Sequence, residues 1–169
     1  MRILSKVLVV GLVLGIAGCT NAVGGYDSGL GGPGASGNPE GGLISDQTSA
    51  AYFQQAIGDR VLFPVNLSTL TDESRATLVA QADWMSLNTD YKAIIEGHAD
   101  EQGTREYNIA LGARRADTVR EFLISRGVAG NRLQVVSFGK ERPLEICSDE
   151  TCYSKNRRAV TVLAGGLTG

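Results

Sequence analysis

Two side chains of opposite charge, Asp100 and Arg115, mark the part of this chain with the greatest capacity for chemistry. Asp100 lies in the sequence EGHADEQGT, where Gly97 and Gly103 predict a loop after an apolar segment of strand type. Arg115 lies in the next segment, whose apolar period predicts a helix. A carboxylate and a guanidinium placed in this way could hold a zwitterion, with its ammonium on Asp100 and its carboxylate in a forked contact with Arg115.

Asn108 and Leu111 precede Arg115 by seven and four residues. At about 100° per residue, these three positions fall on one helix face. A different stripe of the same helix, which we expect to pack inward, carries Ile109, Ala113, Ala116, Val119 and Leu123. We therefore expect an amide and an apolar contact beside Arg115, with N–H groups of the helix start as further anion donors.

Other interpretations of these residues stay open. Asp100 could only cap a turn, with Arg115 as a solvated helix residue. Glu96, His98 and Asp100 also alternate as on one face of a strand, which could form a metal or acid–base site. His98 is the only histidine and no HExxH sequence occurs, so we interpret it as a hydrogen-bonded strand-end residue that shapes the pocket.

The flanking patterns predict an α+β domain that would position these residues. Asp72 and Glu73 suit the positive end of a helix, and Trp84 lies beside the apolar stripe of that helix, so we assign Trp84 to the core. The expected helices are 46–57, 72–87 and 107–126, and the first of them would have its cap at Ser45. The expected strands are 60–63, 91–96, 133–138 and 158–163. From the first strand onward the order is βαβαββ, and two helices would cover one face of a mixed sheet as a two-layer sandwich.

Four sequences, EGHADEQGT, EYNIALGARRADTV, VVSFGKERP and KNRRAV, resemble motifs of the OmpA-like C-terminal domain family. The order and spacing of these motifs resemble those of the family from Asp59 to Leu163. Their residues resemble those of the lipoproteins of the Tol-Pal system. The resemblance implies the OmpA-like fold and a domain that binds the meso-diaminopimelate of peptidoglycan stem peptides. The positions that match the family's ligand residues are Asp100, Arg115, Asn108 and Leu111.

The end of the first predicted strand departs from the family pattern. The family usually has a Phe-Asp pair there as part of the ligand wall, whereas this chain has Val65-Asn66 after Phe63. Asn66 can form hydrogen bonds but carries no charge. We include Phe63, Asn66 and His98 among the expected peptidoglycan-binding residues.

Four further arginines accompany these motifs. Arg157 and Arg158 could contact glycan or a partner protein, or could equally pair with surface carboxylates. We expect Arg114 and Arg120 to be solvated.

The chain begins with the pattern of a bacterial lipoprotein signal. Arg2 and Lys6 precede an apolar run at 7–16, which is shorter than the roughly 20 residues of a membrane span, and Ala17-Gly18 leads to Cys19. The resemblance to such signals implies cleavage before Cys19 and a covalent lipid on that residue. Thr20 follows in place of the aspartate that often retains lipoproteins in the inner membrane, so we expect the outer membrane.

Residues 19–45 are rich in glycine and predict a flexible tether between the lipid and a domain at 46–165 in the periplasm. The chain has 16 basic and 18 acidic residues, and two of the basic ones would leave with the signal at 1–18, so the net charge would approach −4. Nothing in this composition favours nucleic acid.

Cys147 and Cys152 remain, with four residues between them. A redox motif normally has two intervening residues, and a metal site requires about four ligands. In an oxidising periplasm we expect the two cysteines to form a structural disulfide.

The resemblance implies a non-catalytic function without a cofactor or a metal. The protein would hold the outer membrane through its lipid, bind peptidoglycan, and take TolB and TolA as partners, supporting envelope integrity and cell division. One alternative is an enzyme acting on the cell wall, for which His98 is the candidate. Another is a wall-anchoring module of a motor or porin, although such relatives carry a membrane barrel or transmembrane helix ahead of the domain.

Overall fold

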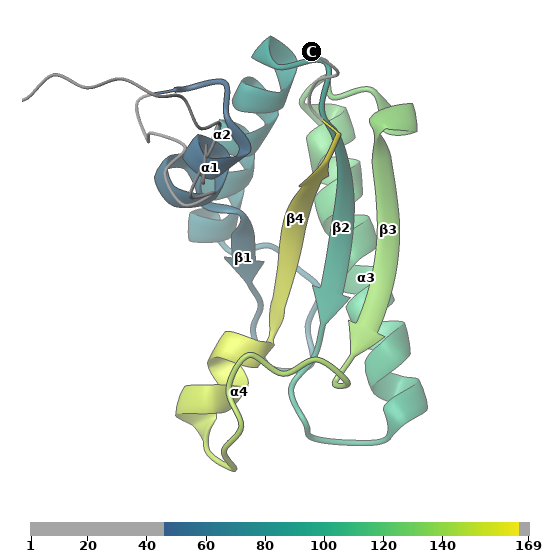
Figure 1. The fold of residues 1–169 in the computed structure, drawn as a ribbon. Helices are drawn as coiled ribbons and strands as arrows, with labels where there is room; N and C mark the ends of the chain where they lie inside the picture. Colours follow the sequence, from purple (N-terminus) through teal and green to yellow (C-terminus); the bar gives the residue numbers. More distant parts are fainter. Residues whose placement is uncertain (1–45, 166–169) are drawn as a thin grey trace, which may run out of the picture. The chain divides into compact units, whose positions relative to one another are not determined.

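The computed structural model describes residues 46–165, so Cys19, Ser45, the predicted signal and the predicted tether lie outside the described residues. The described part contains a four-stranded sheet of order β1-β4-β2-β3 (Figure 1). Its strands are β1 (Arg60–Leu62), β2 (Lys92–His98), β3 (Leu133–Gly139) and β4 (Arg158–Ala164), and its helices are α1 (Ala50–Tyr52), α2 (Asp72–Leu87), α3 (Arg105–Ser125) and α4 (Glu150–Asn156). β2 and β3 are parallel, whereas β4 is antiparallel to β1 and β2. The predicted α+β class and mixed sheet are confirmed.

Helices α2 and α3 contact each other and lie on one face of the sheet, α3 against β2 and β3 and α2 against β1 (Figure 1). Each begins at a threonine cap: the Thr71 hydroxyl accepts from Ser74 N at 3.1 Å, and the Thr104 hydroxyl accepts from Tyr107 N at 3.2 Å. Among residues 46–165, no helix has the length and apolar character to cross a membrane.

The first helix differs from its prediction at 46–57. Residues 46–49 form a turn in which the Asp46 carboxylate accepts from Thr48 N at 2.9 Å. The helix therefore begins only after Ser49, whose hydroxyl accepts from Tyr52 N at 3.1 Å, and it widens into a π-helix at Phe53–Gly58. The cap is thus Ser49, and the prediction of Ser45 was wrong.

Trp84 lies in the core, as predicted. Its ring centroid is 4.9 Å from that of Phe53 and 5.1 Å from that of Tyr91, and its indole N–H donates to Gln47 O at 2.7 Å. Residue 47 is thereby fixed near the start of β2, where Ala164 also pairs with Lys92. Both boundaries of the described part therefore lie at the end of the sheet where β2 begins.

Helix α4 was absent from the predicted order βαβαββ. It is a seven-residue helix between β3 and β4, and its cap is Asp149, whose carboxylate accepts from Thr151 N at 2.8 Å and from Cys152 N at 3.2 Å. α4 lies at the end of the sheet where β4 begins (Figure 1).

Two glycines let α3 approach β2 closely. A Cβ atom on Gly97 would overlap the carbonyl oxygen of Gly112, and one on Gly112 would lie 2.8 Å from the carbonyl oxygen of Gly97. Because neither position tolerates a side chain without movement, the backbone of α3 lies directly against the last residues of β2.

Candidate ligand-binding site

The sheet topology gathers the expected site residues at one end. β1, β2 and β3 run in the same direction and β4 runs against them, so the last residues of three strands meet the first residues of the fourth (Figure 1). Phe63 follows β1, His98 ends β2 and Arg157 precedes β4. The first half of α3 lies against the same end because of the contact between Gly97 and Gly112.

Arg115 is fully buried at this end, with 0% of its surface exposed. Its guanidinium donates to three main-chain carbonyl oxygens: Nε to Leu67 at 2.9 Å, Nη1 to His98 at 2.8 Å and Nη2 to Pro64 at 3.1 Å. Its Cζ also lies 5.3 Å from the centroid of the Phe63 ring. The side chain is therefore fixed in one orientation and is not a solvated helix residue.

The charge of Arg115 has no carboxylate partner within 4.0 Å among residues 46–165. Burial lowers the pKa of Arg115 to about 10, and the negative charge of Asp100 opposes this shift. The guanidinium thus remains protonated at neutral pH, compensated by carbonyl dipoles and a carboxylate beyond ion-pair distance. A buried charge in this state favours an added anion.

Asp100 is 6% exposed, and its Oδ2 lies 3.2 Å from Nη1 of Arg157. Its Oδ1 accepts from Gln102 N at 3.3 Å. Arg157 also donates through Nε to Phe63 O at 3.2 Å and through both terminal nitrogens to the carboxylate of Glu150. Of the two roles left open for Arg157, the structure has the pairing with carboxylates: the guanidinium is buried, and its partners are the buried Asp100 and the exposed Glu150.

Asn108 and Leu111 are buried beside Arg115, at 1% and 2% exposure. The Asn108 amide donates to Gln102 O at 2.9 Å, while its Oδ1 has no hydrogen-bond donor among the described residues. The buried stripe of α3 therefore includes the predicted ligand face, whereas Ile109 and Ala113, predicted to face the core, are only half-buried. The face of α3 with Asn108, Leu111 and Arg115 is buried because it packs on the sheet. The segment after β1, whose carbonyl oxygens accept from Arg115, also covers it.

His98 is hydrogen-bonded at the end of β2 through its main-chain carbonyl oxygen and not through its ring. Both ring nitrogens are buried and have no hydrogen-bond partner within residues 46–165, and Nε2 lies 3.7 Å from the Glu96 carboxylate. Burial, followed by the charges of Arg158 and Arg142, lowers the pKa of His98 to about 4, so the ring is neutral and this contact is no ion pair. His98 serves the site through its carbonyl oxygen, which holds Arg115.

Phe63 and Asn66 have different positions relative to this end of the sheet. Phe63 is 3% exposed and its ring faces the guanidinium of Arg115. Asn66 is exposed and has a φ of 55°, a left-handed conformation that asparagine adopts more readily than most residues. Asn66 thus shapes the segment that carries Pro64 and Leu67.

Cys147 and Cys152 form a disulfide, with Cα atoms 5.9 Å apart. Together with Asp149 they are also the one group of potential metal-ligating side chains that residues 46–165 bring together, but both sulfurs are bonded to each other. The bridge joins the loop after β3 to the first turn of α4, the turn that carries Glu150.

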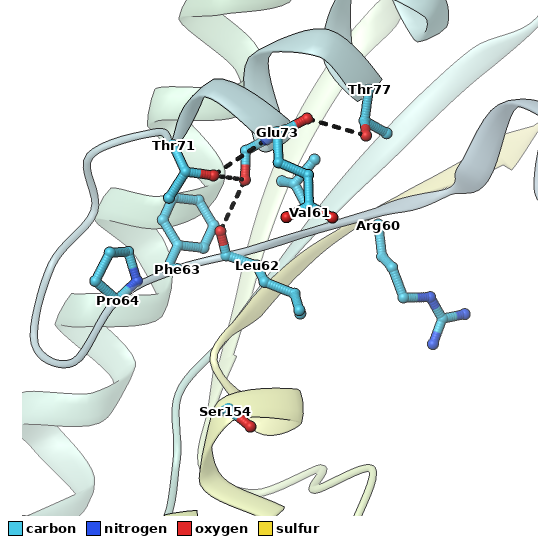
Figure 2. Close-up of a pocket in the computed structure, with 10 residues that line it drawn as sticks. Arg60, Val61, Leu62, Phe63, Pro64, Thr71, Glu73, Thr77 and Ser154 are labelled. Atoms are coloured by element: carbon cyan, nitrogen blue, oxygen red, sulfur yellow. Dashed lines mark hydrogen bonds between the residues drawn. The ribbon is translucent and has the colours of Figure 1, made fainter. Parts of the chain in front are cut away.

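A pocket of about 490 Å³ lies beside β1 and the first turns of α2 (Figure 2). Phe63 and Pro64 line it, but Asp100 and Arg115 do not. This pocket is therefore separate from the paired charges at the strand ends.

The remaining arginines divide by burial. Arg158 is 7% exposed and donates to the carbonyl oxygens of Asn156 and Arg142, so it is neither free for glycan nor paired with a surface carboxylate. Arg114 is exposed, as predicted, and Arg120 is half-buried beside Glu121.

Sequence reasoning missed Glu150 and left the role of Arg157 open. The available signal was Asp149-Glu150 before a short polar segment, which is typical of a helix start. The pairing of Arg157 with Asp100 could not be found from spacing, because 57 residues separate them.

Comparisons with known proteins identify the family of this chain. Residues 62–157 match the OmpA family. The peptidoglycan-associated lipoprotein of Mesorhizobium japonicum is 46% identical over 159 residues, covering 90% of this chain and 88% of the relative. That of Agrobacterium fabrum is 44% identical over 163 residues, covering 94% of this chain and 87% of the relative.

Solved structures match the fold as well. The crystal structure of the peptidoglycan-associated lipoprotein from Burkholderia pseudomallei superimposes with a TM-score of 0.64 at 32% identity, covering 72% of this chain and 98% of that chain. The C-terminal domain of Helicobacter pylori MotB, at 20% identity and a TM-score of 0.60 over 64% of this chain and 85% of that chain, shares the fold. This chain therefore belongs to the OmpA family and, within it, to the peptidoglycan-associated lipoproteins, which are binding proteins and not enzymes.

Proposed function

We propose that this chain is an outer-membrane lipoprotein whose domain binds peptidoglycan non-covalently and so links the membrane to the cell wall. It would act in the Tol-Pal system, with TolB and TolA as protein partners and roles in envelope integrity and cell division. The names of its relatives support the association with peptidoglycan. The geometry at the strand ends supports the zwitterionic tip of meso-diaminopimelate as the group that is bound.

The observation that carries this proposal is the state of Arg115, a buried and immobilised cation without a carboxylate partner in residues 46–165. A guanidinium has five N–H donors, and three of them are engaged by carbonyl oxygens. One N–H on each terminal nitrogen remains, which suits a forked contact with the two oxygens of a ligand carboxylate. Such a carboxylate would also neutralise the buried charge.

The ammonium of the same ligand would lie between Asp100 and Asn108. Asp100 supplies a carboxylate that is already buried, and the unpartnered Oδ1 of Asn108 is an acceptor without a donor among the described residues. A buried acceptor in this state is costly, and a ligand N–H would relieve the cost. The two charges of the ligand thus correspond to two charges of the domain.

Access to Arg115 requires movement of the segment with Pro64 and Leu67, or of the loop after Asp100, because the guanidinium has no exposed surface. Desolvation of the ligand charges offsets part of the Coulomb gain, which favours moderate and reversible affinity. Many copies acting together would still hold the wall firmly.

The test of the site is sedimentation of the full-length chain, in detergent, with purified sacculi. Asp100→Asn removes the charge and keeps the shape, and we expect binding to weaken by at least about tenfold. Asp117→Asn, an exposed aspartate on α3, is the matched control and should bind like the wild type. Equal binding by both variants would contradict the assignment of Asp100.

The test of the anchor is Cys19→Ser. We expect this variant to leave the membrane fraction and to bind sacculi as well as the wild type, because the lipid and the wall site are separate. Retention in the membrane fraction would show that the signal has been misread.

A further inference from the structure

The carboxylate of Glu150 lies where it competes with Asp100 for a single guanidinium. Both terminal nitrogens of Arg157 donate to Glu150, whereas only Nη1 reaches Asp100, at 3.2 Å. Glu150 is the more exposed partner, with 64% of its side chain accessible against 8% for Asp100. Arg157 is thus shared between a carboxylate at the surface and a carboxylate in the candidate ligand site.

The shared contact has a consequence for Asp100. If Arg157 gave both terminal nitrogens to Asp100, it would form the forked pair that guanidinium groups favour, and the carboxylate would be fully neutralised. In the structure Glu150 takes the forked position, and Asp100 retains Oδ1, whose partner is the weaker main-chain donor Gln102 N at 3.3 Å. A positively charged ligand group therefore meets a carboxylate whose charge is only partly compensated.

The charges around Asp100 also balance with Glu150 present. Asp100 and Glu150 are negative, and Arg157 and Arg115 are positive, so the four groups sum to zero. Removing Glu150 would leave one excess positive charge, which favours an anion over a zwitterion. The competition for Arg157 and the sum of charges therefore both favour binding of a positively charged ligand group at Asp100.

We propose that Glu150 is a positioning residue for the ligand site: it draws Arg157 away from Asp100 and so makes the site selective for a free ammonium. This inference rests on the proposed binding of the diaminopimelate zwitterion. Glu150 acts through Arg157 and need not touch the ligand. The Cys147–Cys152 disulfide and the Asp149 cap fix the helix turn that presents it.

The experiment compares Glu150→Gln with Glu145→Gln in the full-length chain in detergent. Glu145 is the matched control, because it lies on the loop that leads to α4 and pairs at 3.1 Å with Lys155 instead of Arg157. The probes are a stem peptide with free diaminopimelate and the same peptide with its side-chain amine acetylated. We expect Glu150→Gln to weaken binding of the free peptide about fivefold, not to weaken binding of the acetylated peptide, and to be rescued in part by Glu150→Asp.

A second measurement does not depend on the ligand. The backbone amide of Gln102 donates to Asp100, so its NMR chemical shift reports the state of that carboxylate. Glu150→Gln should move this resonance, and Glu145→Gln should not. An unmoved Gln102 resonance, or an equal loss of affinity for both peptides, would overturn the inference. Failure of the wild-type chain to bind the free peptide would instead overturn the proposed function, and the Gln102 resonance would then decide the coupling of Glu150 to Asp100.

Discussion

Arg115 on α3 and Arg157 before β4 are both buried at the same end of the sheet, yet their surroundings differ. Arg115 is held by three carbonyl oxygens, whereas Arg157 is held by one carbonyl and two carboxylates. Burial acts to lower the pKa of both guanidinium groups, but the hydrogen bonds that Arg157 donates to Glu150 and Asp100 outweigh burial and raise the pKa of Arg157. One arginine is electrostatically satisfied within the domain and the other is not.

This difference separates an arginine that organises the site from one that is available to a ligand. Carbonyl oxygens orient a guanidinium without neutralising it, so Arg115 keeps its capacity for an external anion. Carboxylates neutralise it, so Arg157 contributes by controlling its neighbours. The same residue type at the same end of the fold thus has two functions, set by its acceptors.

Truncation of Arg115 should have the largest effect on the domain. Arg115→Ala would leave the main-chain carbonyls of His98, Leu67 and Pro64 without their guanidinium donor. We expect it to destabilise the domain by about 3 to 5 kcal/mol and to abolish sacculus binding. Arg114→Ala, at the adjacent exposed position, should change stability by less than about 0.5 kcal/mol. Thermal unfolding of both variants measures this, and equal stability would contradict the structural role of Arg115.

Acid should lower the free energy of unfolding of the domain through His98, the last residue of β2. The pKa of His98 is about 4 in the folded chain against an ordinary value of 6.5, so between these limits the unfolded chain binds a proton that the folded chain excludes. Stability should therefore fall as the pH decreases from 6.5, by about 1.4 kcal/mol per pH unit and about 3 kcal/mol in total from this residue. The groups near the ring are Arg158, Arg142 and Glu96.

The control for this pH dependence is His98→Gln, which cannot titrate. The difference in unfolding free energy between the wild type and this variant should change across pH 6.5 to 4. A constant difference would mean that the pKa of His98 is the same in the folded and the unfolded chain.

Loss of the disulfide should act on the surroundings of Arg157 and spare those of Arg115. On the chain-entropy model, Cys147→Ser with Cys152→Ser costs about 2 kcal/mol, because the bridge closes a short loop of sequence separation 5. Hydrogen exchange should quicken in α4 and remain slow in the middle of α3. Equal loss of protection in both helices would show that the two arginine environments are not independent.

Much of the fold could be predicted because its signals are local. Thr71, Asp72 and Glu73 mark the start of α2, and the predicted helix at 72–87 has the observed bounds. The buried face of α3 was harder to predict, because the apolar period does not show which of two helix faces a distant segment covers. The carbonyls of Pro64 and Leu67 cover Arg115 from more than 45 residues away.

Helix α4 and the pairs of Arg157 could not be predicted for a related reason. Seven residues are too few for a helical period to be recognised, and the stability of α4 comes from the Asp149 cap and the disulfide. Arg157 meets Phe63 and Asp100 only because β4 inserts between β1 and β2. Spacing along the chain contains no information on that insertion.

The boundaries of the described domain, near Gln47 and Ala164, lie where β2 begins, and Asp100 lies just beyond the point where it ends. At about 3.3 Å per residue, the seven residues of β2 separate these points by roughly 20 Å. A force applied at residue 46 and resisted by a ligand at Asp100 and Arg115 would therefore run along the strands. The hydrogen bonds between β2 and β4 would then be loaded in shear, all together, and could not open one after another like a zipper.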